Sequence, residues 1–408
     1  MLWQPSLPEK YHQMSEAEIA DAIDARKQRL ADDLLILGHH YQQDSVVRHA
    51  DLRGDSLKLA QLAAEQAAQR GTRYIVFCGV HFMAETAEIV TDDSVQVILP
   101  DLSAGCSMAD MADYDDTVEA WDAIHDALGK KCNGRVIPIT YVNSTAAIKA
   151  FVGEHGGACC TSSNASAIFK WALDGGTKKK KRGEQIKILF LPDQHLGRNT
   201  AKQFGFVTEV DAQRGNGKKP QCAVWDPKLD NGGLTDEQIR DASVLLWAGH
   251  CSVHKLFRPE HVDQARQRFA NDGGVTVIVH PECPQEVVDK ADLSGSTGQI
   301  INAIEQAEPG TNFSVGTEVH LVNRLANDAK QRDITVTMLS DCQCLCTTMY
   351  RIEPRNLLWV LDNLADGKVV NRIEVTPKAA ELATHALDRM LAHAGATAAR
   401  PAAATAKN

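Results

Sequence analysis

Short apolar segments recur along the chain, and each one stops abruptly at small or polar residues. They lie at residues 34–37, 74–77, 95–99, 136–140, 186–191 and 275–279. Each is followed by a segment in which apolar residues recur at helical spacing. Strands that alternate with helices in this way are typical of right-handed βαβ units around a parallel sheet. The pattern therefore predicts an α/β protein.

Three of the helical segments begin at residues that cap helix N-termini. Asp55 and Ser56 precede the first, residues 162–164 precede the second, and Ser296 and Thr297 precede the third. A hydroxyl group at a helix start is commonly a cap, but the same position also binds phosphate or carboxylate groups. The residues alone leave both interpretations open.

Polar residues that could carry out chemistry follow the predicted strands directly. They are His39, Tyr41, Cys106, Tyr141, Asn143, His195, His280 and Glu282. Ligands of parallel sheets bind outside the carboxyl ends of the strands, so these side chains mark the functional edges. There are too many strands for one small sheet, and the chain has no single Gly-rich dinucleotide fingerprint. We therefore expect several similar α/β/α subdomains with parallel, Rossmann-like sheets whose strand ends converge on one site.

The composition of the 408 residues limits the function. The net charge is −10, with 43 basic and 53 acidic residues, and the one dense basic run, residues 178–182, is short. This balance argues against nucleic-acid binding. Residues 1–10 lack the apolar core of a signal peptide, and no stretch is long and apolar enough to span a bilayer. We expect a cytoplasmic protein without a membrane partner, with a surface insertion at 204–241 and a disordered tail at 393–408.

Three of the eleven cysteines crowd into five positions, at Cys342, Cys344 and Cys346, and Cys106 and Cys251 stand far upstream in turns of small and polar residues. Thiols stay reduced in the cytoplasm, and thiolates are preferred ligands of iron–sulfur clusters and soft metals. This pattern predicts a metal or redox centre. The remaining cysteines suit packing or loops: Cys78, Cys132, Cys159, Cys160, Cys222 and Cys283.

Three other kinds of protein would use such a run of cysteines. Paired structural zinc sites show two Cys-x2-Cys knuckles, whereas this chain has one Cys-x-Cys-x-Cys run with no partner knuckle. An electron carrier would ligate its cluster with four cysteines, and ferredoxins draw most of them from one loop at other spacings. A thiol–disulfide protein explains neither residues 141–143 nor residues 280–282. The residues favour a cluster whose cysteines come from distant turns.

Eleven short runs of residues occur in an order that resembles one known family. They are residues 38–41, 54–57, 82–87, 104–107, 141–143, 161–163, 192–198, 247–251, 279–282, 295–297 and 346–349. The family is quinolinate synthase, whose members are iron–sulfur enzymes of NAD biosynthesis. The resemblance extends from about residue 34 to residue 365, which is nearly the whole chain.

The resemblance implies three similar α/β/α subdomains around a pseudo-threefold axis, each giving one cysteine to a 4Fe-4S cluster in a central active site. The implied ligands are Cys106, Cys251 and Cys346. Cys346 directly precedes Thr-Thr-Met349, which selects it over its two neighbours and leaves the roles of Cys342 and Cys344 open. We place the subdomains at residues 1–112 together with 342–392, at 113–250 and at 251–341.

The resemblance also implies the reaction, in which iminoaspartate and dihydroxyacetone phosphate condense to quinolinate, phosphate and two waters. Three protein ligands leave one iron of the cluster open, and an open iron can act as a Lewis acid in dehydration. We also expect functional coupling to the enzyme that supplies iminoaspartate.

A carboxylate and an imidazole on one turn can pass protons in both directions, which favours Glu282 and His280 as the acid–base pair. The expected catalytic residues are Glu282, His280, Tyr41 and Tyr141. The expected substrate-binding residues are His39, Ser56, Tyr141, Val142, Asn143, Ser162, His280, Pro281, Glu282 and Thr297. His195, Arg198, His254 and Glu318 are expected to support the site.

Overall fold

The chain is an α/β protein with three parallel sheets flanked by helices, as the alternation of strands and helices predicts. The computed structural model describes residues 4–129, 133–215, 217–341, 344–393 and 400–401. Within these residues, no helix is both long enough and apolar enough to cross a membrane.

The chain divides into two compact units. The first comprises Met1–Cys106, Glu318–Leu321 and Leu345–Ala380, and the second comprises Ser107–Thr317, Val322–Cys344 and Glu381–Asn408. One sheet belongs to the first unit and two belong to the second. The division into three subdomains with the boundaries given above stays a prediction.

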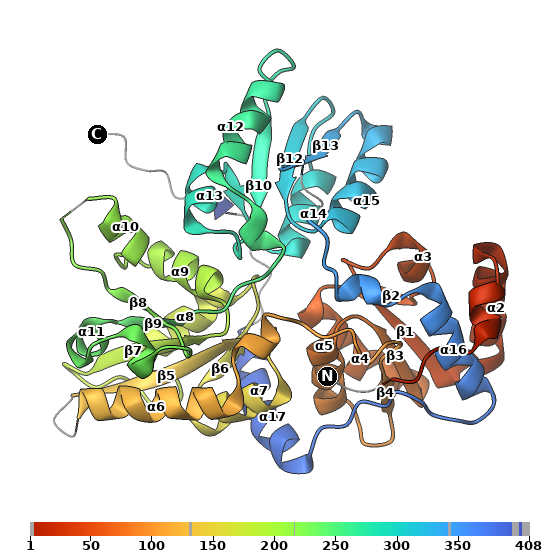
Figure 1. Cartoon of the computed structure of the whole chain (residues 1–408), viewed down its shortest axis with the longest axis horizontal. Helices are drawn as coiled ribbons and strands as arrows, with labels where there is room; N and C mark the ends of the chain where they lie inside the picture. Colours follow the sequence, from red (N-terminus) through yellow and green to blue (C-terminus); the bar gives the residue numbers. More distant parts are fainter. Residues whose placement is uncertain (1–3, 130–132, 216, 342–343, 394–399, 402–408) are drawn as a thin grey trace. The chain divides into compact units, whose positions relative to one another are not determined.

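The first unit holds a sheet of four parallel strands in the order β2-β1-β3-β4. The strands are β1 (Leu34–His39), β2 (Leu52–Gly54), β3 (Tyr74–Cys78) and β4 (Gln96–Ile98). The helices are α1 (Glu9–Gln13), α2 (Glu16–Leu30), α3 (Asp44–Val47), α4 (Ser56–Arg70), α5 (His81–Val90) and α16 (Pro354–Ala365). Helices α4 and α5 pack together on one face of the sheet, and α2 packs against α16 on the other (Figure 1). Every residue of β1 and β3 is buried, which explains why these strands are continuous apolar runs.

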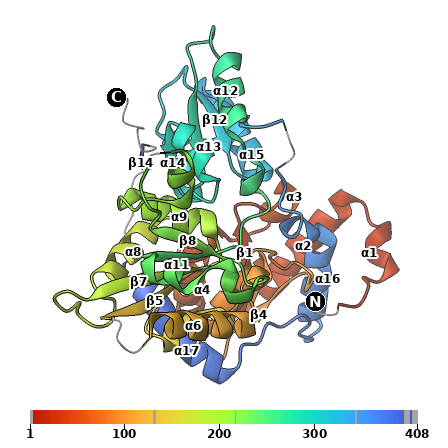
Figure 2. The ribbon, with the colours of Figure 1, turned by 60° about the vertical axis from the view of Figure 1, so that its left-hand side comes forward.

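The second sheet, in the second unit, has five parallel strands in the order β6-β5-β7-β9-β8. The strands are β5 (Gly134–Tyr141), β6 (Ala158–Cys160), β7 (Gln185–Leu191), β8 (Cys222–Trp225) and β9 (Val244–Trp247). The helices are α6 (Tyr114–Leu128), α7 (Ala146–Glu154), α8 (Ala165–Leu173), α9 (Gln194–Gln203), α10 (Glu209–Gln213), α11 (Asp236–Asp241) and α17 (Pro377–Leu391). Helices α8 and α9 cover one face, and α6 and α7 cover the other (Figures 1 and 2). The segment 204–241 contributes α10, β8 and α11, and β8 forms an edge of this sheet.

The third sheet also belongs to the second unit, and its parallel strands have the order β13-β12-β10-β11. The strands are β10 (Thr276–Val279), β11 (Leu293–Ser294), β12 (Asn312–Gly316) and β13 (Thr335–Met338). The helices are α12 (Pro259–Arg268), α13 (Gln285–Lys290), α14 (Thr297–Glu305) and α15 (Val319–Ala329). The short β14 (Arg400–Pro401) pairs antiparallel with β11 (Figure 2). Most of the tail expected to be disordered, residues 393–408, lies outside the described residues.

Helix α17 packs closely on α7 at Gly153. A methyl group at this glycine would overlap the carbonyl oxygen of Leu382. Arg389 of α17 donates hydrogen bonds to the carbonyl oxygens of Gly153 and Gly157. The last turn of α7 is therefore fixed by backbone contact rather than by interdigitating side chains.

Gly153→Ala should destabilise the protein by about 1–3 kcal/mol, because the added methyl group forces α17 away from α7. Gly298→Ala is the matched control, since Gly298 lies in α14 and its added methyl group meets no atom within 4 Å. The control should be neutral or stabilising by up to about 1 kcal/mol. Urea unfolding of both variants measures the difference, and equal stability would contradict the close packing.

Candidate functional site

The carboxylate of Glu282 is buried in the second unit, three residues after β10 ends at Val279. Its Oε1 accepts a hydrogen bond of 2.6 Å from the hydroxyl of Tyr141, the last residue of β5. Its Oε2 lies 2.9 Å from Nδ1 of His254, and Nδ1 of His280 lies 3.6 Å from Oε1. The end of β5, the turn after β9 (Val244–Trp247) and the turn after β10, from two sheets, thus bring these four side chains together.

The surroundings of this cluster give Glu282 and His280 different charge states. Burial acts to raise the pKa of Glu282, but the neighbouring His254 and His280 and the hydrogen bonds from His254 and Tyr141 bring it to about 2. Burial, and then the neighbouring His254, lower the pKa of His280 to about 3. Glu282 is therefore ionised and His280 is neutral near pH 7. A charged acceptor thus lies beside a neutral ring that offers one N–H donor and one acceptor nitrogen.

Asn199 of α9 holds the turn that carries His280 and Glu282. Its buried side-chain amide donates hydrogen bonds of 2.8 Å to the carbonyl oxygen of Pro281 and 2.9 Å to that of Cys283. The turn itself closes through a hydrogen bond from the Cys283 amide to the His280 carbonyl. One side chain thus satisfies two buried carbonyl groups on either side of Glu282.

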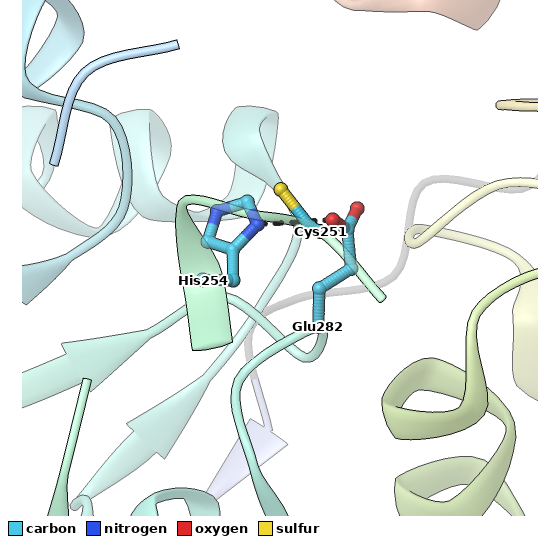
Figure 3. Close-up of side chains that lie close together, drawn as sticks. All are labelled: Cys251, His254 and Glu282. Atoms are coloured by element: carbon cyan, nitrogen blue, oxygen red, sulfur yellow. Dashed lines mark hydrogen bonds and ion pairs between the residues drawn. The ribbon is translucent and has the colours of Figure 1, made fainter. Parts of the chain in front are cut away.

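Cys251, His254 and Glu282 offer ligand atoms that all lie within 4.8 Å of one another. Figure 3 shows the three side chains pointing toward one another, with the His254 to Glu282 interaction drawn as a dashed line. Cys251 follows β9, and the backbone amide of Lys255 donates to its carbonyl oxygen, which forms the turn that places His254. A thiolate, an imidazole and a carboxylate in this arrangement can hold a metal ion.

Asp193 is a second buried carboxylic acid of the same unit. Its Oδ1 caps α9 by accepting hydrogen bonds of 2.7 Å and 2.8 Å from the amides of His195 and Leu196. Its Oδ2 is buried and has no hydrogen-bond partner among the described residues. Burial, and then the charge of Glu282, raise the pKa of Asp193 well above its usual range.

A cavity of about 380 Å³ lies in the second unit beside the Pro281 turn. Its lining includes Ser162, Asn164, Phe204, Pro281, Gly295 and Gln299. The next helix, α14, begins at the buried Thr297, and its N-cap Ser296 forms a capping box with Gln299. The predicted binding residues Ser162 and Pro281 thus border one hollow near the start of a helix. A hollow of this size suits a small metabolite.

Two other predicted residues of the second unit, Val142 and Asn143, directly follow the end of β5. Val142 is buried and donates its backbone amide to the carbonyl oxygen of Cys160. Asn143 is partly exposed, yet its Oδ1 is buried without a hydrogen-bond partner among the described residues. An oxygen of this kind is suited to accept a hydrogen bond from a ligand.

Several predicted site residues belong to the first unit. His39 ends β1 and accepts a hydrogen bond of 3.1 Å at Nδ1 from the backbone amide of Tyr41, and the two rings meet edge to face. Ser56 is the first residue of α4. Cys106 and Cys346 are both partly exposed.

The cysteines differ in how accessible they are. Cys106, Cys251 and Cys346 are partly exposed, whereas the other described cysteines are buried: Cys78, Cys159, Cys160, Cys222, Cys283 and Cys344. Burial raises the pKa of both Cys78 and Cys159 to about 12, which suits packing rather than metal binding. Cys132 and Cys342 lie outside the described residues. Burial also raises the pKa of Cys346, but hydrogen bonds from the Met349 amide and from Thr348 oppose this effect.

Sequence reasoning located Tyr141, His280 and Glu282 but did not find Asn199, Asp193 as a partner of Glu282, or Thr317. Thr317 Oγ1 lies 3.2 Å from Nε2 of His254. His254 was expected only to support the site. Its spacing of three residues from Cys251 was the one local signal that it faces the same point in space.

Comparison with known proteins identifies the family. Residues 21–392 match the family model described as Quinolinate synthetase A protein. The chain belongs to this family. It is 50% identical over 388 residues to the quinolinate synthase of Herpetosiphon aurantiacus, which covers 95% of this chain and 96% of that protein. It is 47% identical over 393 residues to the enzyme of the same name from Rhodopirellula baltica, covering 94% of this chain and 92% of the relative. These matches support quinolinate synthase activity, and the family implies NAD biosynthesis and a metal cofactor.

In a quinolinate synthase, the Asn199 contacts should matter for turnover as well as for stability. Asn199→Ala leaves two buried carbonyl groups unsatisfied, which should cost about 2–4 kcal/mol and lower kcat more than it changes KM. Asn312→Ala is the matched control, because Asn312 likewise bridges two carbonyl oxygens, those of Asp272 and Gly274, but at the amino end of β12. Asn312→Ala should leave kcat unchanged. Equal losses of kcat in both variants would show that Asn199 does not position Glu282.

Because the fold lowers the pKa of His195, the stability of the protein should also decrease as the pH falls. Burial, and then Arg198, lower the pKa of His195 from its ordinary 6.5 to about 3. Between these values the unfolded chain binds more protons than the folded chain, so the free energy of unfolding decreases as the pH falls. His195→Gln should reduce this slope by up to about 1.4 kcal/mol per pH unit. Urea unfolding at pH 7, 6 and 5 measures the slope, with His125→Gln on the exposed face of α6 as the control. An unchanged slope in His195→Gln would refute the assignment.

Proposed function

We propose that the protein condenses iminoaspartate with dihydroxyacetone phosphate to give quinolinate, phosphate and two waters. Family membership supports the product, and the Glu282 cluster is the observation that carries the chemistry. An ionised, buried carboxylate that contacts a phenol and two imidazoles matches a reaction in which several protons must move. We further propose a cytoplasmic enzyme that is functionally coupled to the enzyme supplying iminoaspartate.

We propose Cys106, Cys251 and Cys346 as the ligands of a 4Fe-4S cluster. They are the partly exposed cysteines of the described chain, and the chemistry of a thiolate donor set fits such a cluster. The hydrogen bonds from Met349 and Thr348 to the Cys346 sulfur are of the kind that tune cluster thiolates. When bound, a cluster with three protein ligands offers one open iron as a Lewis acid for dehydration.

Glu282 is the proposed base that deprotonates the triose phosphate. In the protein without substrate, hydrogen bonds from Tyr141 and His254 stabilise the ionised carboxylate. They help to lower its pKa, which makes it a weak base. A substrate oxygen that takes over the Tyr141 hydrogen bond would make Glu282 more basic. His280, neutral and beside it, receives or returns the proton, and Tyr41 and Tyr141 are further acid–base candidates.

Substrate binding is assigned to hydroxyl, amide and imidazole groups at strand ends and helix starts. The start of α14 at Thr297 and the hydroxyl of Ser162 are suited to a phosphate or a carboxylate. Asn143, with its Oδ1 buried and unpaired in the described chain, is suited to an imine or hydroxyl donor. His39 and Ser56 complete the proposed set, with Val142 and Pro281 contributing backbone groups.

The test is iron content and quinolinate formation in protein purified without air. Cys106→Ser, Cys251→Ser and Cys346→Ser should each lose the cluster and all turnover, whereas Cys344→Ser should keep both. Glu282→Gln should keep wild-type iron and lose at least about a hundredfold in kcat, as expected for a general base. Iron retained in Cys346→Ser but lost in Cys344→Ser would overturn the ligand set. Full turnover in Glu282→Gln would remove its catalytic role.

A further inference from the structure

We propose that protein free of its cluster binds one zinc ion through Cys251, His254 and Glu282. The three residues all belong to the second unit, and each offers a ligand atom within 4.8 Å of the other two. Such an ion would make a different site from the proposed cluster, since it shares only Cys251 with it. The zinc site rests on this geometry and does not depend on the proposed function.

The residues around the triad already hold its ligands in the orientation that a metal needs. Without a metal, Nδ1 of His254 donates to Glu282. An ion that displaces this proton would shift the ring to the tautomer in which Nε2 donates to Thr317 Oγ1, 3.2 Å away, and the Nδ1 lone pair would then be free to bind the ion. The Tyr141 hydroxyl donates to Oε1 of Glu282, so Oε2 faces His254. Outer-shell partners that fix the tautomer of a histidine and the rotation of a carboxylate are a regular feature of metal sites.

A stacking contact also fixes the orientation of the His254 ring. It stacks on His280 with a centroid distance of 4.4 Å and an angle of 15° between the planes. Both rings are buried, as is the Glu282 carboxylate, while Cys251 is partly exposed. An ion can therefore arrive from the cysteine side and complete its shell with water there.

Zinc is the divalent ion that this donor set fits best. One sulfur, one imidazole nitrogen and one carboxylate oxygen with an open fourth position match a three-ligand zinc site. Zinc–ligand bonds of about 2.0–2.3 Å imply ligand separations of about 3.3–3.6 Å in a tetrahedral site. The 2.9 Å between His254 and Glu282 would need to widen by about 0.4 Å, and the sulfur would need to approach.

Zinc at this position would compete with the proposed function. It would occupy Cys251, which the cluster needs, and Glu282, which the reaction needs. Loading with zinc should therefore slow cluster assembly, and this effect alone rests on the proposed function. His254 separates the two sites, because it belongs to the zinc triad and not to the cluster ligands.

The experiment uses the full chain, stripped of iron without air and titrated with Co²⁺ as a spectroscopic probe. One Co²⁺ per chain should bind, with a sulfur-to-cobalt charge-transfer band, and one equivalent of Zn²⁺ should displace it. Cys251→Ser should lose the band, and His254→Gln and Glu282→Gln should each weaken binding at least about tenfold. Thr317→Val, which removes the Oγ1 partner of His254 and keeps all three ligands, should weaken it about 10–100-fold.

Cys106→Ser and Cys346→Ser are the matched controls, since each removes a proposed cluster thiolate and leaves the triad intact. Both should bind Co²⁺ like the wild type. Loss of the band in either control would place the ion among the cluster cysteines and overturn the proposal. Equal binding by all variants would show an adventitious ion only and would overturn it as well.

Reconstitution of the same proteins with iron and sulfide separates this proposal from the proposed function. Zinc-loaded wild type should take up its cluster at least about tenfold more slowly than zinc-free protein, as expected for a shared ligand. His254→Gln should escape most of this delay. If Cys106→Ser and Cys346→Ser still assemble a full cluster, the proposed ligand set fails while the zinc site stands. If they lose the cluster but Co²⁺ binding is absent in every protein, the zinc site fails while the cluster stands.

Discussion

A carboxylate buried at the end of β10 must receive hydrogen bonds, because an isolated charge away from water is very costly. Glu282 is almost inaccessible to solvent and receives its hydrogen bonds from Tyr141 and His254. Neither donor comes from the loop that carries the acid. The turn after β10, the end of β5 and the turn after β9 must therefore all be correctly positioned for the buried carboxylate to carry its charge. The second and third sheets of the same unit are coupled at this point.

Helix α9 stabilises the turn that carries Glu282. It starts at the Asp193 cap directly after β7, and six residues later Asn199 reaches the carbonyl groups on both sides of Glu282. Lys202, one turn further, forms ion pairs with Asp211 and Asp289. Asp289 lies on α13, the helix that follows the Glu282 turn. One short helix of the second sheet thus fixes both the turn and the helix of the third sheet that surround the acid.

The strands that were predicted are apolar on both faces, whereas β2, β6, β9, β12 and β13 were not predicted. β1, β3, β5, β7 and β10 coincide with the apolar runs of the sequence, and the polar residues at their ends were correctly placed at strand ends. β8 was missed because its four residues stand in a segment rich in Gly, Lys and Asp, and β11 has only two residues. The pairing of Tyr141 with Glu282 joins positions 141 residues apart, and no local pattern reports such a contact. Asn199 gave no signal either, because a polar residue in the middle of a helix usually faces solvent.

The neighbouring His254 and His280, and then the hydrogen bonds to both of its oxygens, keep Glu282 charged in preference to the second buried acid, Asp193. Glu282 has donors to both of its oxygens, whereas Asp193 has two backbone donors to Oδ1 and none among the described residues to Oδ2. Two negative charges in one low-dielectric region repel, so the acid beside the two histidines, Glu282, keeps its charge and raises the pKa of Asp193. Any ligand that withdraws a hydrogen bond from Glu282 weakens this preference and draws the two pKa values together. A ligand that accepted the Tyr141 hydrogen bond would therefore change the basicity of Glu282 and the acidity of Asp193 together.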